Sequence, residues 1–495
     1  MTTPRISSKL ATVVGACALT AIAALSWLAQ AEEAPPAAPA PVAPTAAAPA
    51  PTAPTPPVEP AAPFAFADFS WAPGNAGASE RPLSWGPFVG ELRVDVAYHD
   101  DMSQPIDDTI SGSSEAFRSG EFQLTQFGIG GDFFYKNVQA RFMTQFGMYS
   151  ETTPRNDASP GKGQWDLADA FRYISEAYGG YHLDVMNGIN IQAGIFMSYI
   201  GLWSYYNYDN WTYQPSYVSS NTPWFFNGMR VQIFPSDKLK IEPWLINGWQ
   251  SYGVFNQQPG VGAQILWKPT GAVTFVSNNY YGTDVLQTPG RMRVHTDNSL
   301  MVKYFDRPSG FFSKMAASLT VDAGCEWGGS GGTANGALIP AGQVTCANGT
   351  ASDPAQFFVG FMAYNRFWFD HDIFGLTLGG GAINNPGRYL VLLPPINGAT
   401  AYSGTPYFTE SPGNQFQAWD CQATFDYMPV GYITFRLEYT HRAASVPYFT
   451  GHYGVTPIVD GVMGNVGAPG SEVPGWSPDL TNTEDRVTVA MLIKL

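Results

Sequence analysis

Residues 431–442 read G-Y-I-T-F-R-L-E-Y-T-H-R, and apolar and polar side chains alternate along them. Because successive side chains of a β-strand point to opposite faces, one face carries the apolar residues Ile433, Phe435, Leu437 and Tyr439. The other face carries Arg436 and Glu438. In a water-soluble sheet the apolar face would pack into a core, whereas in a transmembrane barrel it would meet lipid and the polar face would line a wet lumen.

The composition favours extended β-structure. The chain has 495 residues, of which 13% are charged and 14% aromatic, with 52 glycines and a mean hydropathy of −0.10. This length predicts several soluble domains or one large barrel. Beyond the N-terminus, no apolar run approaches the roughly 20 residues that a membrane helix needs. The formal charge of −15 argues against nucleic acid as a partner, because nucleic-acid binding needs a basic face.

The first 31 residues predict a signal peptide. Arg5 and Lys9 form a positive start, residues 10–28 an apolar stretch, and Ala29-Gln30-Ala31 a small-x-small cleavage site. A lipoprotein box ending at Cys17 is the alternative, but the apolar stretch continues well past that cysteine. We therefore expect an exported protein whose signal peptide spans residues 1–31.

Residues 32–86 are expected to be a periplasmic tether and linker. Residues 32–63 are almost entirely alanine and proline, which cannot bury a core and favour an extended polyproline-like chain. Residues 64–86 are aromatic and rich in turn residues, and their sequence does not place them. A flexible spacer is the simplest role for residues 32–63, and contact with peptidoglycan is the alternative.

Residues 87–495 contain about sixteen segments that we expect to be strands. They lie at residues 91–98, 126–135, 138–146, 171–183, 189–195, 229–234, 240–250, 261–268, 272–281, 294–305, 311–322, 356–368, 373–381, 419–427, 431–442 and 487–495. Sixteen is an even number, as bacterial outer-membrane barrels require.

The connections between these segments are of two kinds. Tight turns are expected at residues 136–137, 235–238, 269–271, 306–310, 370–372 and 428–431, and long loops rich in Gly, Ser, Asn and Pro at 99–120, 150–168, 202–222, 326–354, 384–413 and 444–484. Short periplasmic turns and long extracellular loops are typical of outer-membrane barrels. The fold predicted is therefore a transmembrane antiparallel β-barrel in a bacterial outer membrane, in contact with its lipid.

The chain ends on a strand whose outward face closes with Leu495. Outer-membrane barrels commonly end on such a strand, which the barrel assembly machinery reads. The last residue of the signal is usually Phe or Trp, so Leu495 departs from the pattern.

The order of these features resembles the outer-membrane β-barrel porin family described as OmpL-like, over roughly residues 85–495. The residues that carry the resemblance are Ala193-Gly194-Ile195-Phe196, Ile200-Gly201, Asn210-Trp211, Pro223-Trp224, Gly228-Met229-Arg230, Asn279-Tyr280-Tyr281-Gly282, Asn385-Pro386-Gly387-Arg388-Tyr389, Trp419, Phe425-Asp426-Tyr427 and Arg436-Leu437-Glu438-Tyr439. The resemblance implies an outer-membrane pore and little about its solute. Porins of this size are commonly homotrimers.

If the apolar faces meet lipid, charged side chains of the opposite faces project into the lumen. There they would filter ions through a transverse field, or pair with one another and hold the wall. We expect both, with pairing the commoner role and a weak preference for cations. The expected pore-lining residues are Glu91, Arg93, Asp95, Arg141, Arg230, Lys314, Asp322, Asp420, Asp426, Arg436 and Glu438.

The third long loop, residues 202–222, is strongly aromatic. By analogy with general porins, it would fold inward and form a constriction, and its rings would also suit stacking against sugars. An interfacial girdle or a self-packed loop is the alternative. The candidate constriction residues are Trp203, Tyr205, Tyr206, Trp211 and Tyr213.

Cys325 and Cys346 bracket a glycine-rich loop, so a disulfide is expected there in an exported protein, with two free thiols as the alternative. Cys421 is expected to be a small hydrophobic residue of a strand. No catalytic motif is present, and His441 has no obvious catalytic partner, so no enzyme activity, metal or cofactor is expected.

The function predicted is a porin for passive diffusion of ions and small hydrophilic solutes. One alternative is a structural or adhesive outer-membrane protein with a plugged lumen. The other is a substrate-specific channel for a sugar or an ion.

Overall fold

A computed structural model describes residues 62–495 except 75–80, 155–156, 158, 160–162, 255–257, 284–289, most of 329–354, 387–415 and most of 457–477. The predicted signal peptide and residues 32–61 of the predicted tether lie outside the described residues.

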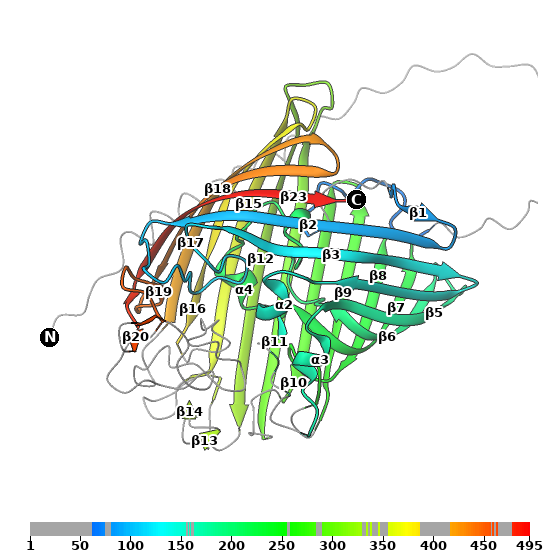
Figure 1. The fold of residues 1–495 in the computed structure, drawn as a ribbon. Coiled ribbons are helices and arrows are strands. Elements are labelled where there is room, and N and C mark those ends of the chain that lie inside the picture. Colours follow the sequence, from blue (N-terminus) through cyan, green and yellow to red (C-terminus); the bar gives the residue numbers. More distant parts are fainter. Residues whose placement is uncertain are drawn as a thin grey trace, which may run out of the picture.

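Sixteen antiparallel strands form a closed barrel (Figure 1). The last strand pairs with β2, with Arg93 opposite Lys494 at one end and Asp101 opposite Arg486 at the other. This pairing closes the sheet and leaves no free edge, as a bilayer requires. The strands are β2 (Phe88–Asp101), β3 (Phe122–Tyr135), β4 (Val138–Thr144), β5 (Ile174–Leu183), β6 (Ile189–Met197), β7 (Phe225–Ser236), β8 (Leu239–Ile246), β9 (Gly260–Thr270), β10 (Val273–Gly282), β11 (Arg291–Asp306), β12 (Phe312–Gly328), β15 (Phe357–Phe369), β16 (Phe374–Asn385), β17 (Phe416–Val430), β18 (Ile433–Ala444) and β23 (Thr483–Lys494).

Each of the sixteen predicted strands corresponds to one strand of the barrel, so the predicted fold is confirmed. The remaining elements are small. Ser84–Trp85 (β1) pairs with the start of β2. Three pairs of two-residue strands lie in the loops: β13 (Thr333–Ala334) with β14 (Ala337–Leu338), β19 (Phe449–Thr450) with β22 (Leu480–Thr481), and β20 (Ile458–Val459) with β21 (Val462–Met463). The short helices named here are α2 (Tyr149–Thr152), α3 (Leu167–Phe171), η4 (Asn207–Asp209) and α4 (Tyr217–Ser220). Within the described residues, no helix is long and apolar enough to cross a membrane.

The exposure of β18 is the inverse of that in a water-soluble sheet. Leu437 is 51% exposed, whereas its neighbour Glu438 is fully buried. Phe435 and Tyr439 are exposed on the same outer face as Leu437. Apolar side chains therefore form the outer surface and charged ones the interior, as expected for a barrel whose outer face meets hydrocarbon.

The loop asymmetry is also confirmed. The β3–β4 turn is a two-residue hairpin in which Lys136 and Asn137 have φ of 46° and 67°, the left-handed conformation of a type I′ turn. At the other end of the barrel, 20 residues separate β2 from β3 and 27 separate β6 from β7 (102–121 and 198–224).

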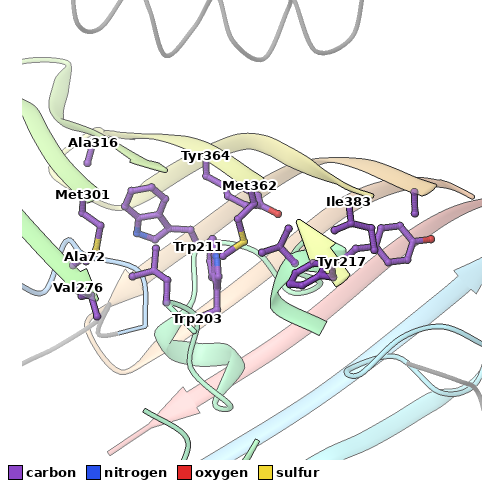
Figure 2. Packing of buried hydrophobic residues seen from close by; sticks show 14 of the residues in the cluster. Ala72, Trp203, Trp211, Tyr217, Val276, Met301, Ala316, Met362, Tyr364 and Ile383 are labelled. Carbon is purple, nitrogen blue, oxygen red and sulfur yellow. The ribbon is translucent and has the colours of Figure 1, made fainter. Parts of the chain in front are cut away.

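The long β6–β7 connection, residues 198–224, lies inside the barrel, and we call it the inward loop. It contains η4 and α4, and its Trp203 and Trp211 belong to a buried apolar cluster formed with the walls of β10–β12 and β15–β17. Figure 2 shows these two tryptophans in the middle of the cluster, with Ala72 and strand residues around them.

Ala72 belongs to residues 62–74, which the sequence did not place. In the structure this segment packs into the same cluster through Phe69, Trp71 and Ala72. The residues just before the barrel are thus partly inside it, which differs from a free linker. Loss of water contact around large aromatic rings explains why an otherwise irregular segment adopts this position.

Candidate functional site: the barrel lumen

All eleven charged residues expected to line the pore belong to the inward faces of their strands. Glu91, Arg93 and Asp95 are at most 5% exposed on β2, and Asp322 is fully buried on β12. Lys314 lies near the periplasmic end of β12 and forms an ion pair with Asp372 at 2.7 Å. The other six inward residues are Arg141 on β4, Arg230 on β7, Asp420 and Asp426 on β17, and Arg436 and Glu438 on β18.

Most of these groups are paired rather than free in water. Asp426 accepts hydrogen bonds from both Arg366 and Arg436, each at 2.7 Å. Arg141 contacts Glu176 at 2.8 Å and Glu91 at 3.1 Å. Such pairs compensate the cost of removing charges from water.

Two wall carboxylates bind the backbone of the inward loop. Glu438 accepts the N–H groups of Tyr213 at 2.6 Å and Gln214 at 2.8 Å. Asp420 accepts the N–H of Tyr217 at 2.9 Å and the hydroxyl of Ser216 at 2.8 Å. Charge-assisted bonds of this kind are about twice as strong as neutral ones, so the wall fixes the path of the loop.

Arginines and Asp95 complete the attachment. Arg436 donates to the carbonyl of Asn210 at 2.8 Å, and Arg93 contacts Asp209 at 2.9 Å. Asp95 accepts from Asn207 at 2.8 Å and from the hydroxyl of Tyr213 at 3.1 Å. The main role of these groups is therefore to hold the inward loop in place, and any filtering of ions is secondary to it.

The five aromatic residues proposed for the constriction all lie in the lumen. Trp211 and Tyr213 are fully buried, and Trp203 and Tyr206 are at most 8% exposed. Tyr205 is half-buried and donates its hydroxyl to Gln145 at 2.6 Å. The loop is thus folded into the lumen, as the constriction hypothesis predicts, and is also packed on itself, as the alternative of a self-packed loop predicts.

A strip of inner wall on β4–β8 stays partly exposed beside the inward loop. Its side chains form a hydrogen-bonded row: Gln139 donates to Asn190 at 3.0 Å, and Asn190 donates to Gln232 at 2.9 Å. We call this row the polar strip. Its residues are Gln139, Arg141, Asn190, Arg230, Gln232 and Lys240. The strand alternation that places Arg141 and Arg230 in the lumen also assigns Gln139 and Gln232 to it, and the same rule could have found Asn190 and Lys240.

Residues 90–460 match the model of the family described as "Putative beta-barrel porin-2, OmpL-like". The chain belongs to this porin family. No curated protein matches the porin in sequence.

Several solved structures are similar to this porin, all outer-membrane channels or porins. The channel DcaP of Acinetobacter baumannii is 12% identical, with 83% of this chain and 99% of that chain covered and a TM-score of 0.43. OprB of Pseudomonas putida is 8% identical, with 82% and 94% covered and a TM-score of 0.44. An anion-selective porin from Comamonas acidovorans is 7% identical, with 82% and 99% covered and a TM-score of 0.44.

The porin is an outer-membrane channel by family. Among the described residues, no group of three or more His, Cys, Asp or Glu side chains is arranged to hold a metal ion.

A cavity of about 180 Å³ lies against the inward loop of the porin. Trp203, Tyr205 and Trp224 contribute to its lining, together with the buried carboxyl of Glu115 from the β2–β3 loop. Burial raises the pKa of Glu115 to about 7, although hydrogen bonds from Ser114 and Gln214 oppose the shift. The cavity is therefore aromatic and hydroxyl-rich, with a carboxyl that changes charge near neutral pH.

Cys325 and Cys346 are joined by a disulfide in the structure, with their Cα atoms 5.3 Å apart. The bridge connects the end of β12 to the extracellular β12–β15 loop. Cys421 lies on the outer face of β17 and belongs to no disulfide among the described residues.

Proposed function

We propose that this porin is a narrow passive channel in which ions and small hydrophilic solutes move along the polar strip. The observation that carries the proposal is the hydrogen-bonded row from Gln139 through Asn190 to Gln232, which stays partly exposed, whereas Trp203 and Trp211 of the inward loop pack against the walls of β10–β12 and β15–β17. Amide and charged side chains can replace part of the hydration shell of a passing solute.

The charges along the strip support a weak selectivity. Arg141 is compensated by Glu91, Glu176 and Asp132, and Lys240 by Glu242 at 2.8 Å. Arg230 is held against aromatic rings, 4.5 Å from the ring centre of Phe196. Because local charges nearly cancel, the formal charge of −15 favours a weak preference for cations.

Single-channel recording of the purified protein in planar bilayers tests this function. We expect small open steps, a cation-favouring reversal potential under a salt gradient, and loss of current with small but not large uncharged polymers in the bath. A reversal potential that favours anions would contradict the proposed selectivity. Competitive block by one sugar or ion would instead favour the substrate-specific channel.

A second candidate is a structural or adhesive protein whose lumen is plugged. The burial of Trp211 and Tyr213 in the inward loop and of Trp71 before the barrel favours it. The same bilayer recording separates the two, because a plugged barrel would give no open steps under conditions in which it is folded and inserted.

Several finer statements accompany the proposal. We propose export through the signal peptide of residues 1–31, insertion by the barrel assembly machinery, and outer-membrane lipid as the solvent of the outer face. A homotrimer is proposed as the assembly, to be tested by cross-linking in detergent. Contact of residues 32–63 with peptidoglycan would be tested by co-sedimentation with purified sacculi.

A further inference from the structure

Residues 62–74 enter the barrel from its periplasmic end. The N–H of Phe64 donates to the carbonyl of Asp237 in the β7–β8 turn at 2.7 Å. The indole N–H of Trp71 donates to the carbonyl of Gly271 in the β9–β10 turn at 3.1 Å. The segment is thus attached to two neighbouring periplasmic turns.

Three lysines near the same end contact the aromatic rings of the segment. The ammonium group of Lys268 lies 3.8 Å from the ring centre of Phe69, and that of Lys238 lies 5.1 Å from the ring centre of Phe66. Lys303 lies 5.9 Å from Trp71. Cation–π contacts of this kind add to the burial of the rings.

Within the lumen, the segment joins the inward loop. The indole N–H of Trp211 donates to the carbonyl of Trp71 at 3.0 Å. Gly74 has a φ of +75°, and a Cβ atom there would lie 2.3 Å from the carbonyl oxygen of Leu202. Only glycine fits this approach, which fixes the end of the segment against the start of the loop.

The two segments extend across the lumen together. Trp211 packs against Trp368 on β15 with ring centres 5.7 Å apart, and the cluster reaches Met428 near the end of β17. The hydroxyl of Tyr208 in the loop donates to the carbonyl of Gly431 in the β17–β18 turn at 2.6 Å. The cluster therefore spans from the β9–β10 side to the β17–β18 side at the periplasmic end.

We infer that residues 62–74 are a resident plug of the periplasmic mouth, which narrows the path below the inward loop, and that Trp71 is the positioning residue that joins plug and loop. This inference rests on the proposed channel function for its conductance effect. Its structural part, the seating of the plug, stands independently of conduction.

Single-channel conductance tests whether residues 62–74 narrow the path through the barrel. Deletion of residues 62–74 and the substitution Trp71→Ala are each expected to raise single-channel conductance at least twofold. Trp85→Ala is the matched control: it removes an indole of the same size, but Trp85 lies outside residues 62–74 and is 83% exposed, whereas Trp71 is 1% exposed, so conductance should be unchanged. Heat-modifiable migration on gels verifies that each variant forms a barrel.

Thiol labelling tests the seating without any need for current. In a Cys421→Ser background, Ala72→Cys should react slowly with a water-soluble maleimide, because Ala72 is 4% exposed. Adding Trp71→Ala should accelerate the reaction at least tenfold. Rapid labelling in the folded protein with intact Trp71, or unchanged conductance on deletion in a conducting channel, would overturn the plug. Slow labelling in a barrel that stays silent even after deletion would retain the plug and refute the proposed channel.

Discussion

Glu438 accepts the backbone N–H of Tyr213 at 2.6 Å, across 225 residues of sequence. One partner belongs to the barrel wall and the other to the loop that fills the lumen. A residue that alternation alone assigns to pore lining therefore acts first as an anchor for the element that narrows the pore.

Removing the charge of this anchor should loosen the inward loop. Glu438→Gln keeps the shape of the side chain but weakens two charge-assisted bonds, at a cost of about 1–3 kcal/mol. We expect noisier single-channel current with a larger mean conductance. Leu437→Ala, on the lipid-facing side of the same strand, is the control and should leave the current as it is in the wild type. Identical noise in both variants would contradict the anchoring role.

Asp426 is predicted to be a stability hot spot. Asp426→Asn leaves the guanidinium groups of Arg366 and Arg436 buried without their shared carboxylate, and breaking a buried ion pair in this way costs about 3–5 kcal/mol. Gels run after heating should show that the barrel unfolds at a lower temperature. Asp485→Asn, which removes a partly exposed carboxylate at the outer rim, should shift that temperature far less.

Glu115 is predicted to make the loops sensitive to pH. Burial raises its pKa to about 7, so the folded state holds the proton more tightly than the unfolded state does. Stability from this group is therefore greatest below the unfolded pKa near 4.5 and falls as pH rises towards 7.

Glu115→Gln should flatten this dependence between pH 5 and 8, measured as proteolytic cleavage of the extracellular loops. The wild type should be cleaved faster at pH 8 than at pH 5 by a protease whose activity is matched at both values. Equal pH dependence in the variant and the wild type would refute the assignment to Glu115.

The polar strip should control ion selectivity. Gln139→Lys adds a positive charge to the exposed row and should shift the reversal potential towards anions, with conductance for cations reduced severalfold. Gln417→Lys is the matched control, because Gln417 is an exposed residue of β17 outside the lumen. If both variants shift the potential equally, the strip does not line the conduction path.

The disulfide is predicted to form in the exported protein and to be dispensable for the barrel. After denaturation, the mature chain should take up one maleimide on Cys421 without reductant and three with it. Cys346→Ser should still give a heat-modifiable barrel, because the bridge ties a loop rather than two strands. Uptake of three labels without reductant would show that the bridge is not formed.

Much of the barrel could be read from local sequence. All sixteen predicted strands correspond to barrel strands, and Leu437 and Glu438 lie on the faces that alternation assigns to them. The inward faces of β2, β4, β7, β17 and β18 were predictable by the same rule. Their partners were not, because the bonds from Asp420 and Glu438 reach residues more than 200 positions away.

The sequence by itself determined a barrel with lipid outside, charges inside and long loops at one end. Strand period, turn residues and the absence of a long apolar run are local properties, and a bilayer permits few folds that satisfy them. Only the tertiary structure decided that the inward loop and residues 62–74 meet inside that barrel, through Trp211 and Trp71. The two segments are buried because the closed sheet encloses a volume and brings hydrogen-bond donors and acceptors together. No periodicity along the chain encodes these contacts.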